Sequence, residues 1–98
     1  MWRQGDVYVA EAKKVPAGAK VLPHCTLAEG EVTGHSHRVA ERDGATLYSH
    51  NGSLFLVVTA DAVTLIHDEH GPIPLPRGTY RAWQQREYSP EAIRIVRD

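Results

Sequence analysis

The chain has 98 residues, of which 42% are hydrophobic and 23% charged, a globular composition that excludes a disordered or fibrous chain. Its net charge of -1 gives no overall field that would attract nucleic acid or an anionic membrane, so either partner would need a local patch. Because so short a chain has no room for a second core, we expect one domain over residues 1–98.

The cysteine content and the N-terminal segment bear on the compartment. Cys25 is the one cysteine, so no intrachain disulfide can form, and a reducing compartment is expected. The start, MWRQGDVYV, has no charged leader followed by an apolar core, and the longest apolar run, 54–58, is far shorter than a membrane span. We therefore expect a cytoplasmic protein with no membrane partner.

Short strands are predicted along the first third of the chain. The alternating segment VYVA at 7–10 favours a strand. Proline and glycine mark 13–18 as a loop, and 20–22 favours a brief strand that the next proline ends. Residues 24–30 are expected to be irregular.

The middle of the chain predicts strands joined by tight turns. Residues 31–41, EVTGHSHRVAE, favour an extended segment, because valine and threonine prefer strands and glycine is a poor helix former. Asp43-Gly44 and Asn51-Gly52 are hairpin signals on either side of a predicted strand at 46–49. The apolar run 54–59 predicts a strand covered on both faces, at the centre of the core.

The last third predicts two more strands. Residues 60–62 are expected to turn the chain into a strand at 63–67. The segment 68–78, DEHGPIPLPRG, has three prolines and two glycines and is expected to be a loop. A long strand at 79–88 follows, and 89–96 favours either a short C-terminal helix or a turn and a strand. Short strands at regular spacing predict an all-β fold, a small single-domain β-barrel or sandwich.

Histidine is the residue type that stands out. Of six histidines, four lie in two pairs, His35 with His37 and His67 with His70. His-x-His on a strand places two imidazoles on one face, about 7 Å apart at the backbone, so both can reach one ion. The second pair, at a strand end and a turn, could close over the same place. Neutral imidazole suits a divalent transition metal such as Zn, Fe, Mn or Ni. The sequence therefore predicts one metal site, with carboxylates available from Glu41, Asp68 and Glu69.

Interpretations without a shared metal site stay open. The pairs could be a polar strand face, a hydrogen-bonded core histidine and a loop residue, and His24 and His50 are expected to have no ligand role. Alternatively, paired histidines could act as general acid and base in a metal-independent ribonuclease, helped by arginine and tyrosine. The candidates for that help are Arg38, Arg77, Arg81, Tyr80 and Tyr88. Cys25 is expected to be a structural thiol rather than a nucleophile.

The segment from Gly30 to Gly44 resembles the first motif of the cupin family, whose core is His-x-His, three or four residues, then Glu. Here His35-Ser36-His37 is followed after three residues by Glu41, although the flanking glycine spacings are shorter than in the family. The resemblance implies a double-stranded β-helix barrel with the two histidines and Glu41 facing its interior.

The stretch 71–81 resembles the second cupin motif through Pro76-Arg77-Gly78. Arg81 stands where that motif has its histidine, so the resemblance implies a missing ligand that His67 or His70 would replace. The chain also resembles small bacterial proteins with a GDV start and a PLPRGTYR-like tail, from which no activity carries over.

These observations lead to one main functional prediction. We expect a metal-dependent enzyme, such as a hydrolase, that acts on a small or nucleotide-like substrate, with the four paired histidines as metal ligands. The catalytic candidates are Glu41, Arg81 and Tyr80. The alternatives are a non-enzymatic module whose histidines organise a ligand or a homo-oligomer interface, and an RNA-binding protein or ribonuclease that uses histidine and arginine.

Overall fold

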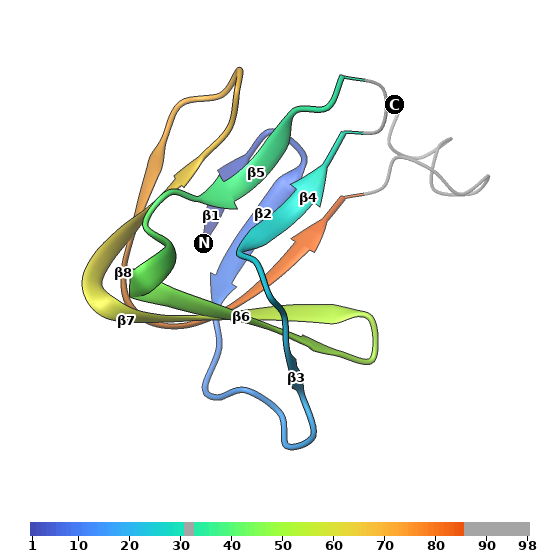
Figure 1. Cartoon of the computed structure of the whole chain (residues 1–98), viewed down its shortest axis with the longest axis vertical. Helices are drawn as coiled ribbons and strands as arrows, with labels where there is room; N and C mark the ends of the chain where they lie inside the picture. The colour runs from blue at the N-terminus through green and yellow to red at the C-terminus, as the bar shows by residue number, and fades with distance from the viewer. Residues whose placement is uncertain (31–32, 86–98) are drawn as a thin grey trace.

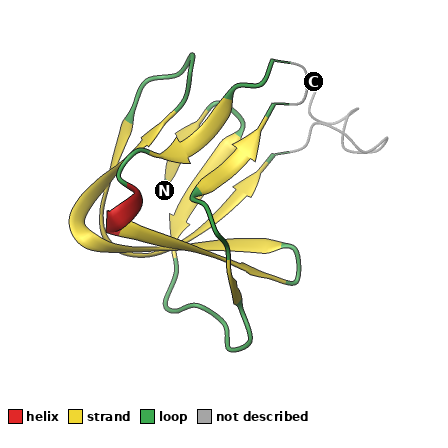
Figure 2. Ribbon diagram, in the orientation of Figure 1, coloured by secondary structure: helices red, strands yellow, loops and turns green. Residues whose placement is uncertain are grey.

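The computed structural model describes residues 1–30 and 33–85, and the helix or strand expected over 89–96 lies outside them. In this part of the chain the only helix is one 3-10 turn, η1 (Arg42–Gly44), which Figure 2 shows in red. The strands, labelled in Figure 1, are β1 (Trp2–Gln4), β2 (Val7–Glu11), β3 (Lys20–Val21), β4 (Thr26–Glu29), β5 (Ser36–Val39), β6 (Ala45–His50), β7 (Ser53–Ile66) and β8 (Ile73–Gln84). The prediction of a small all-β fold is confirmed.

One antiparallel sheet contains all the described strands. Its order is β1-β2-β8-β7-β5-β4, and β6 pairs with β7 while β3 pairs with β6. β7 and β8 bend together (Figure 1), with a shift of register between Val58 and Ala62. The first half of β7 pairs with β6 and the second half with β5, so the bend folds the sheet over itself. The described strands do not close into a barrel, because β1 and β4 remain the ends of the sheet.

The bend replaces a predicted turn. Residues 60–62 remain within β7, so the turn expected there is wrong. β8 follows β7 through the bend and pairs with it on both sides, from Leu54 opposite Ala82 to Leu65 opposite Ile73. The sequence pattern predicted two strands, at 54–59 and 63–67, where the structure has the single strand β7.

The loop expected at 68–78 is shorter than predicted, because β8 begins at Ile73 and includes Pro74 and Pro76. Both prolines lie in register with residues of β7. Residues two apart in an antiparallel strand direct their backbone groups to the same edge. β2 pairs only with residues 80–84 of β8, so the prolines' missing N–H groups face an edge where the described chain places no strand.

Two further expectations are wrong. Residues 24–30, expected to be irregular, contain β4, which pairs with β5. The hairpin expected at Asp43-Gly44 is absent from the described structure, because η1 joins β5 to β6 and these strands pair with others. Gly44 serves close packing instead, since a Cβ there would lie 2.8 Å from Val63 Cγ1.

The Asn51-Gly52 hairpin is confirmed. β6 and β7 pair as far as His50 opposite Ser53, which leaves a two-residue turn. Asn51 and Gly52 have φ values of 51° and 83°, the positive values that a type I′ turn requires.

The core lies between the two halves of the folded sheet and consists mainly of leucine and valine. Leu47, Leu56, Leu65 and Leu75 are all 0% exposed. Two polar residues of the described chain, Gln4 and His37, are buried beside this apolar core, and both belong to the candidate functional site. No helix in the described chain is long and apolar enough to cross a membrane.

Candidate functional site

The four paired histidines gather at one end of the sheet. His37 lies in β5, His35 precedes it, and His67 and His70 follow the end of β7. β5 pairs with the end of β7, with Arg38 opposite Ile66, and this pairing brings the two segments together. The ring centroids are 4.2 Å apart for His37 and His67, 4.6 Å for His67 and His70, 6.1 Å for His37 and His70, and 5.7 Å for His35 and His67. The structure therefore brings together all four residues that the sequence predicts as one group.

Gln4 forms a buried hydrogen bond with the ring of His37. The Gln4 amide nitrogen donates to the carbonyl oxygens of Leu65 and Gly71, each at 2.9 Å. Because carbonyl oxygens only accept, these bonds fix the orientation of the amide and direct its oxygen to His37 Nδ1, 3.0 Å away. The amide oxygen also only accepts, so His37 Nδ1 carries the proton. Neutral His37 then has its lone pair on Nε2.

Asp6 faces that lone pair. It lies in the turn between β1 and β2, and its Oδ1 is 3.3 Å from His37 Nε2. The His37 side chain is 6% exposed and the Asp6 side chain 50%, so the pair runs from the interior to the surface. A charge-assisted N–H···O bond is about 2.7–2.9 Å long, so this contact is longer than an imidazolium–carboxylate hydrogen bond.

The electrostatics keep His37 neutral and Asp6 ionised. Burial lowers the pKa of His37, and the charges of His67 and His70 lower it further, against an opposing effect of Asp6. Partial burial raises the pKa of Asp6, but a hydrogen bond from Gln84 and the proximity of His37 outweigh this and lower it overall. Two electron-rich atoms, a neutral nitrogen and a carboxylate oxygen, thus face each other.

His70 lies against the β1–β2 turn. Gly5 has a φ of 58°, and a Cβ at that position would lie 2.6 Å from His70 Nε2. The absence of a side chain at Gly5 therefore lets the His70 ring approach the turn that carries Asp6. His70 is exposed, and its ring is stacked at 14° to that of His37.

His67 and His35 have other partners. His67 Nδ1 accepts a hydrogen bond of 2.9 Å from the backbone N–H of Glu69, so neutral His67 carries its proton on Nε2. His35 Nδ1 lies 3.7 Å from Glu69 Oε1. As the side chains stand, no group of three or more His, Cys, Asp or Glu residues in the described ranges is positioned to hold a metal ion.

The three catalytic candidates lie away from the histidines. Glu41 is exposed and accepts hydrogen bonds from the backbone N–H and the hydroxyl of Thr64, which lower its pKa. The cupin resemblance implies that Glu41 faces a barrel interior together with His35 and His37. This implication is wrong, because Glu41 lies at the surface. Tyr80 is 2% exposed and donates to the carbonyl of Pro76, so it is a core residue. Arg81 lies on the outer face of β8, over the ring of Trp83.

The other candidates also have structural partners. Asp68 pairs with Arg38 and accepts a bond from Ser36 N–H, and Arg77 pairs with Asp61. Tyr88 lies outside the described residues. Cys25 is buried, with its Sγ 3.5 Å from the Ala45 carbonyl, and is structural as expected.

Sequence reasoning missed Gln4 and Asp6. Gln4 lies opposite buried Val7 in the β1–β2 pair, an inward position that normally holds an apolar residue. That signal needs the register of β1, which the sequence pattern did not identify as a strand. Asp6 gives no local signal beyond its place in a Gly-Asp turn.

The family comparison covers this whole site. A family model described as Domain of unknown function (DUF8820) matches residues 3–85, a range that includes Gln4, Asp6 and the four histidines. No curated protein and no solved structure matches the chain. Because the match spans most of the sequence, the chain belongs to the DUF8820 family.

Proposed function

We propose that this protein binds one divalent transition-metal ion between the β1–β2 turn and the inner end of β5. The observation that carries the proposal is the pair of His37 Nε2 and Asp6 Oδ1, 3.3 Å apart with no proton required between them. Two ligand atoms on a tetrahedral zinc ion are also about 3.3 Å apart, since Zn–N and Zn–O bonds are about 2.0–2.2 Å long. A bound cation would remove the repulsion between the two lone pairs.

The hydrogen bond between Gln4 and His37 supports the proposal. A histidine that binds a metal through one nitrogen commonly donates its other N–H to an oxygen acceptor, which fixes the tautomer and the ring orientation. Gln4 is that acceptor, and its own two bonds to backbone carbonyls hold it in place. The pair is thus organised in advance of binding.

Further ligands are available from the neighbouring rings. His70 Nε2 lies next to the turn that carries Asp6, and a rotation of its exposed side chain would direct it at the ion. His67 can join only after its bond from Glu69 N–H is broken, because in the present arrangement its Nε2 carries the proton. We therefore rank His37, Asp6 and His70 as ligands ahead of His67 and His35.

The donor set favours zinc and its neighbours. Imidazole nitrogen and carboxylate oxygen suit Zn, Fe, Mn and Ni, whereas an all-oxygen shell would suit Mg or Ca. Because Glu41, Tyr80 and Arg81 have partners elsewhere, the proposed role is metal binding that ties the β1–β2 hairpin to β5 and the β7–β8 loop. Catalysis at this site would have to rely on the ion and its bound water.

Calorimetric titration of untagged protein with Zn²⁺ at about pH 7.5 tests the proposal. We expect one ion per chain, with His37→Ala and Asp6→Asn each weakening binding by at least about 10-fold. The matched control is the double variant His24→Ala with His50→Ala, which removes two histidines outside the cluster and should bind as the wild type does. Equal affinity of His37→Ala, Asp6→Asn and the wild type would refute the site.

A further inference from the structure

The outer face of the sheet carries most of the protein's aromatic side chains. The chain has seven aromatic residues, two Trp, four Tyr and one Phe. Four of them lie in register on one face across neighbouring strands: Tyr8 opposite Trp83, and Tyr48 opposite Phe55. Tyr8, Tyr48 and Trp83 are half-buried, whereas Phe55 is buried at 9% exposure. We call this set, with Arg3 and Arg81, the aromatic face.

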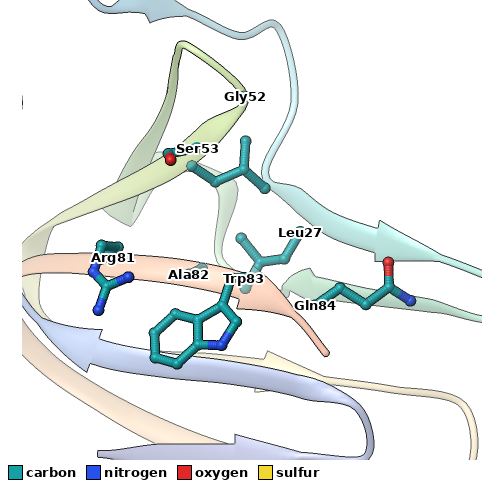
Figure 3. Close-up of a pocket in the computed structure, with 8 residues that line it drawn as sticks. Leu27, Gly52, Ser53, Arg81, Ala82, Trp83 and Gln84 are labelled. Carbon is teal, nitrogen blue, oxygen red and sulfur yellow. The ribbon is translucent and has the colours of Figure 1, made fainter. Parts of the chain in front are cut away.

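Two stacked rings on the aromatic face each contact an arginine. Arg81 lies 4.4 Å from the ring centroid of Trp83, which stacks on Tyr8 at 5.6 Å with an interplanar angle of 12°. Arg3 lies 5.3 Å from the Tyr8 ring, on the next strand. Both arginines are exposed and both rings are half-buried. Figure 3 shows Arg81 and Trp83 extending to the same side of β8.

The charge of this face differs from that of the whole chain. Side chains alternate along a strand, so the residues that share a face can be read from the register. On β1, β2, β6, β8 from 79 to 84 and β7 from 53 to 58, the outward residues that pair in register are Arg3, Tyr8, Ala10, Thr46, Tyr48, His50, Ser53, Phe55, Val57, Thr79, Arg81 and Trp83. This described set contains two arginines and no acidic residue. A face of a protein with net charge -1 is thus locally basic.

A pocket lies across β8 from the aromatic face. It has a volume of about 300 Å³, and its lining includes Leu27, Leu54 and Gln84 besides Arg81 and Trp83 (Figure 3). Leu27 and Leu54 supply apolar walls, and Gln84 supplies an amide that donates to Asp6. Ala82 and Gln84 alternate with Arg81 and Trp83 along β8, so the apolar walls of the pocket lie on the inner side of the strand and the Trp83 indole on its outer side.

We infer that the aromatic face binds single-stranded nucleic acid, with bases stacked on the rings and guanidinium planes and the phosphates held by Arg3 and Arg81. Half-buried aromatic rings on a sheet, with exposed arginines beside them and no acidic residue among the paired outward positions, match what unpaired bases and a phosphate backbone require. Tyr8 and Tyr48 are three strand spacings apart, about 14 Å across the strands, and are offset by two residues along them. A duplex offers no accessible base faces and should bind weakly.

Fluorescence anisotropy with one labelled 12-nucleotide sequence tests this, prepared as single-stranded RNA, as single-stranded DNA and as a DNA duplex. EDTA is present throughout, so that the result does not depend on the metal site. We expect both single strands to bind, with the duplex at least about 10-fold weaker. No binding of either strand at about 100 µM protein and low salt would overturn the inference. Binding of RNA alone would assign the site to RNA, since only RNA has the 2′-hydroxyl.

Variants identify the surface. Trp83→Leu and Tyr8→Leu remove a stacking surface but keep apolar side chains on the sheet, and each should weaken binding by about 10-fold. Circular dichroism checks that each variant folds. Arg81→Gln should reduce the slope of log affinity against log salt by about 0.7, the value for one phosphate contact on a single strand.

Arg77→Gln is the matched control, because it also removes one arginine but from a residue paired with Asp61. It should leave the salt slope unchanged. Unchanged affinity in both Trp83→Leu and Tyr8→Leu, or equal slopes for Arg81→Gln and the wild type, would exclude the aromatic face as the binding surface. If a leucine variant does not fold, the salt slopes of the two arginine variants decide alone.

Discussion

Gln4 Oε1 lies 3.0 Å from His37 Nδ1 in the protein interior, and this one contact determines which nitrogen of His37 is free. Gln4 is 2% exposed and His37 5%. The two residues lie on β1 and β5, near opposite ends of the sheet order, so the contact joins strands that share no backbone hydrogen bonds. The same pair therefore supports the fold and orients the proposed ligand.

Replacing Gln4 by Met should impair both roles. Methionine keeps a similar volume but leaves the carbonyls of Leu65 and Gly71 without their donor, which should cost about 1–3 kcal/mol of unfolding free energy. His37 would also lose its tautomer lock, so Zn²⁺ affinity should fall about 10-fold or more. Urea unfolding and calorimetric titration measure the two effects. Wild-type Zn²⁺ affinity in a folded Gln4→Met protein would contradict the orienting role.

Zn²⁺ should stabilise the protein against heat. An ion bound only by the folded state, at a free concentration of 100 times Kd, adds about 2.7 kcal/mol. For a domain of this size that raises Tm by on the order of 10 °C. Scanning calorimetry with Zn²⁺ and then with excess EDTA should show the rise and its reversal. A rise of equal size in Asp6→Asn would mean that the ion binds elsewhere.

Local features of the fold could be predicted from the sequence. The Asn51-Gly52 turn depends on two adjacent residues that tolerate positive φ, so its prediction needs no tertiary information. His35 and His37 are two residues apart at the start of β5, and alternation alone gives them a common side. That His67 and His70 join them depends on the pairing of β5 with β7, which the paired motifs suggested but did not prove.

Features that depend on distant pairing could not be predicted. Proline normally disrupts a central strand. Pro74 and Pro76 are tolerated in β8 because one edge of β8 has no partner there among the described strands, and the position of an edge depends on the whole sheet. Gln4 contacts residues 33, 61 and 67 positions away in the chain. Local sequence patterns do not reveal contacts between residues so far apart. The role of the buried Gln4 in orienting His37 could therefore be recognised only once the register of the strands was known.

The stability of the metal-free protein should fall between pH 7 and pH 5. In the folded state the pKa of His37 is lowered from 6.5 by burial and by the nearby His67 and His70, with Asp6 opposing. Unfolded His37 therefore binds its proton at a higher pH than folded His37 does. The contribution of His37 to the unfolding free energy is fully present above about pH 6.5 and decreases as the pH falls toward the folded pKa. The lowered pKa of Asp6 acts separately, in the range below about pH 4.

Urea titrations in EDTA from about pH 5 to 8 measure this slope. A folded His37→Asn variant should lose the part of the slope that His37 contributes, while His24→Ala keeps it. The same slope in the wild type and in His37→Asn would show that a group other than His37 causes the pH dependence.

Gly5→Ala tests the contact between the β1–β2 turn and His70. Alanine at a φ of 58° costs about 1–2 kcal/mol in backbone strain, and its Cβ would lie 2.6 Å from His70 Nε2, so the ring must move. We expect a loss of unfolding free energy and a decrease of about 10-fold in Zn²⁺ affinity. Gly18→Ala is the matched control: Gly18 has a φ of 88° with nothing within 4 Å of the added Cβ, so the substitution should cause comparable strain but leave zinc binding unchanged.

A double-mutant cycle with His70→Ala then separates strain from contact, because removing the ring should restore part of the stability lost by Gly5→Ala. Additive effects of Gly5→Ala and His70→Ala would mean that the turn and the histidine do not act on each other, and His70 would then lose its place among the proposed ligands.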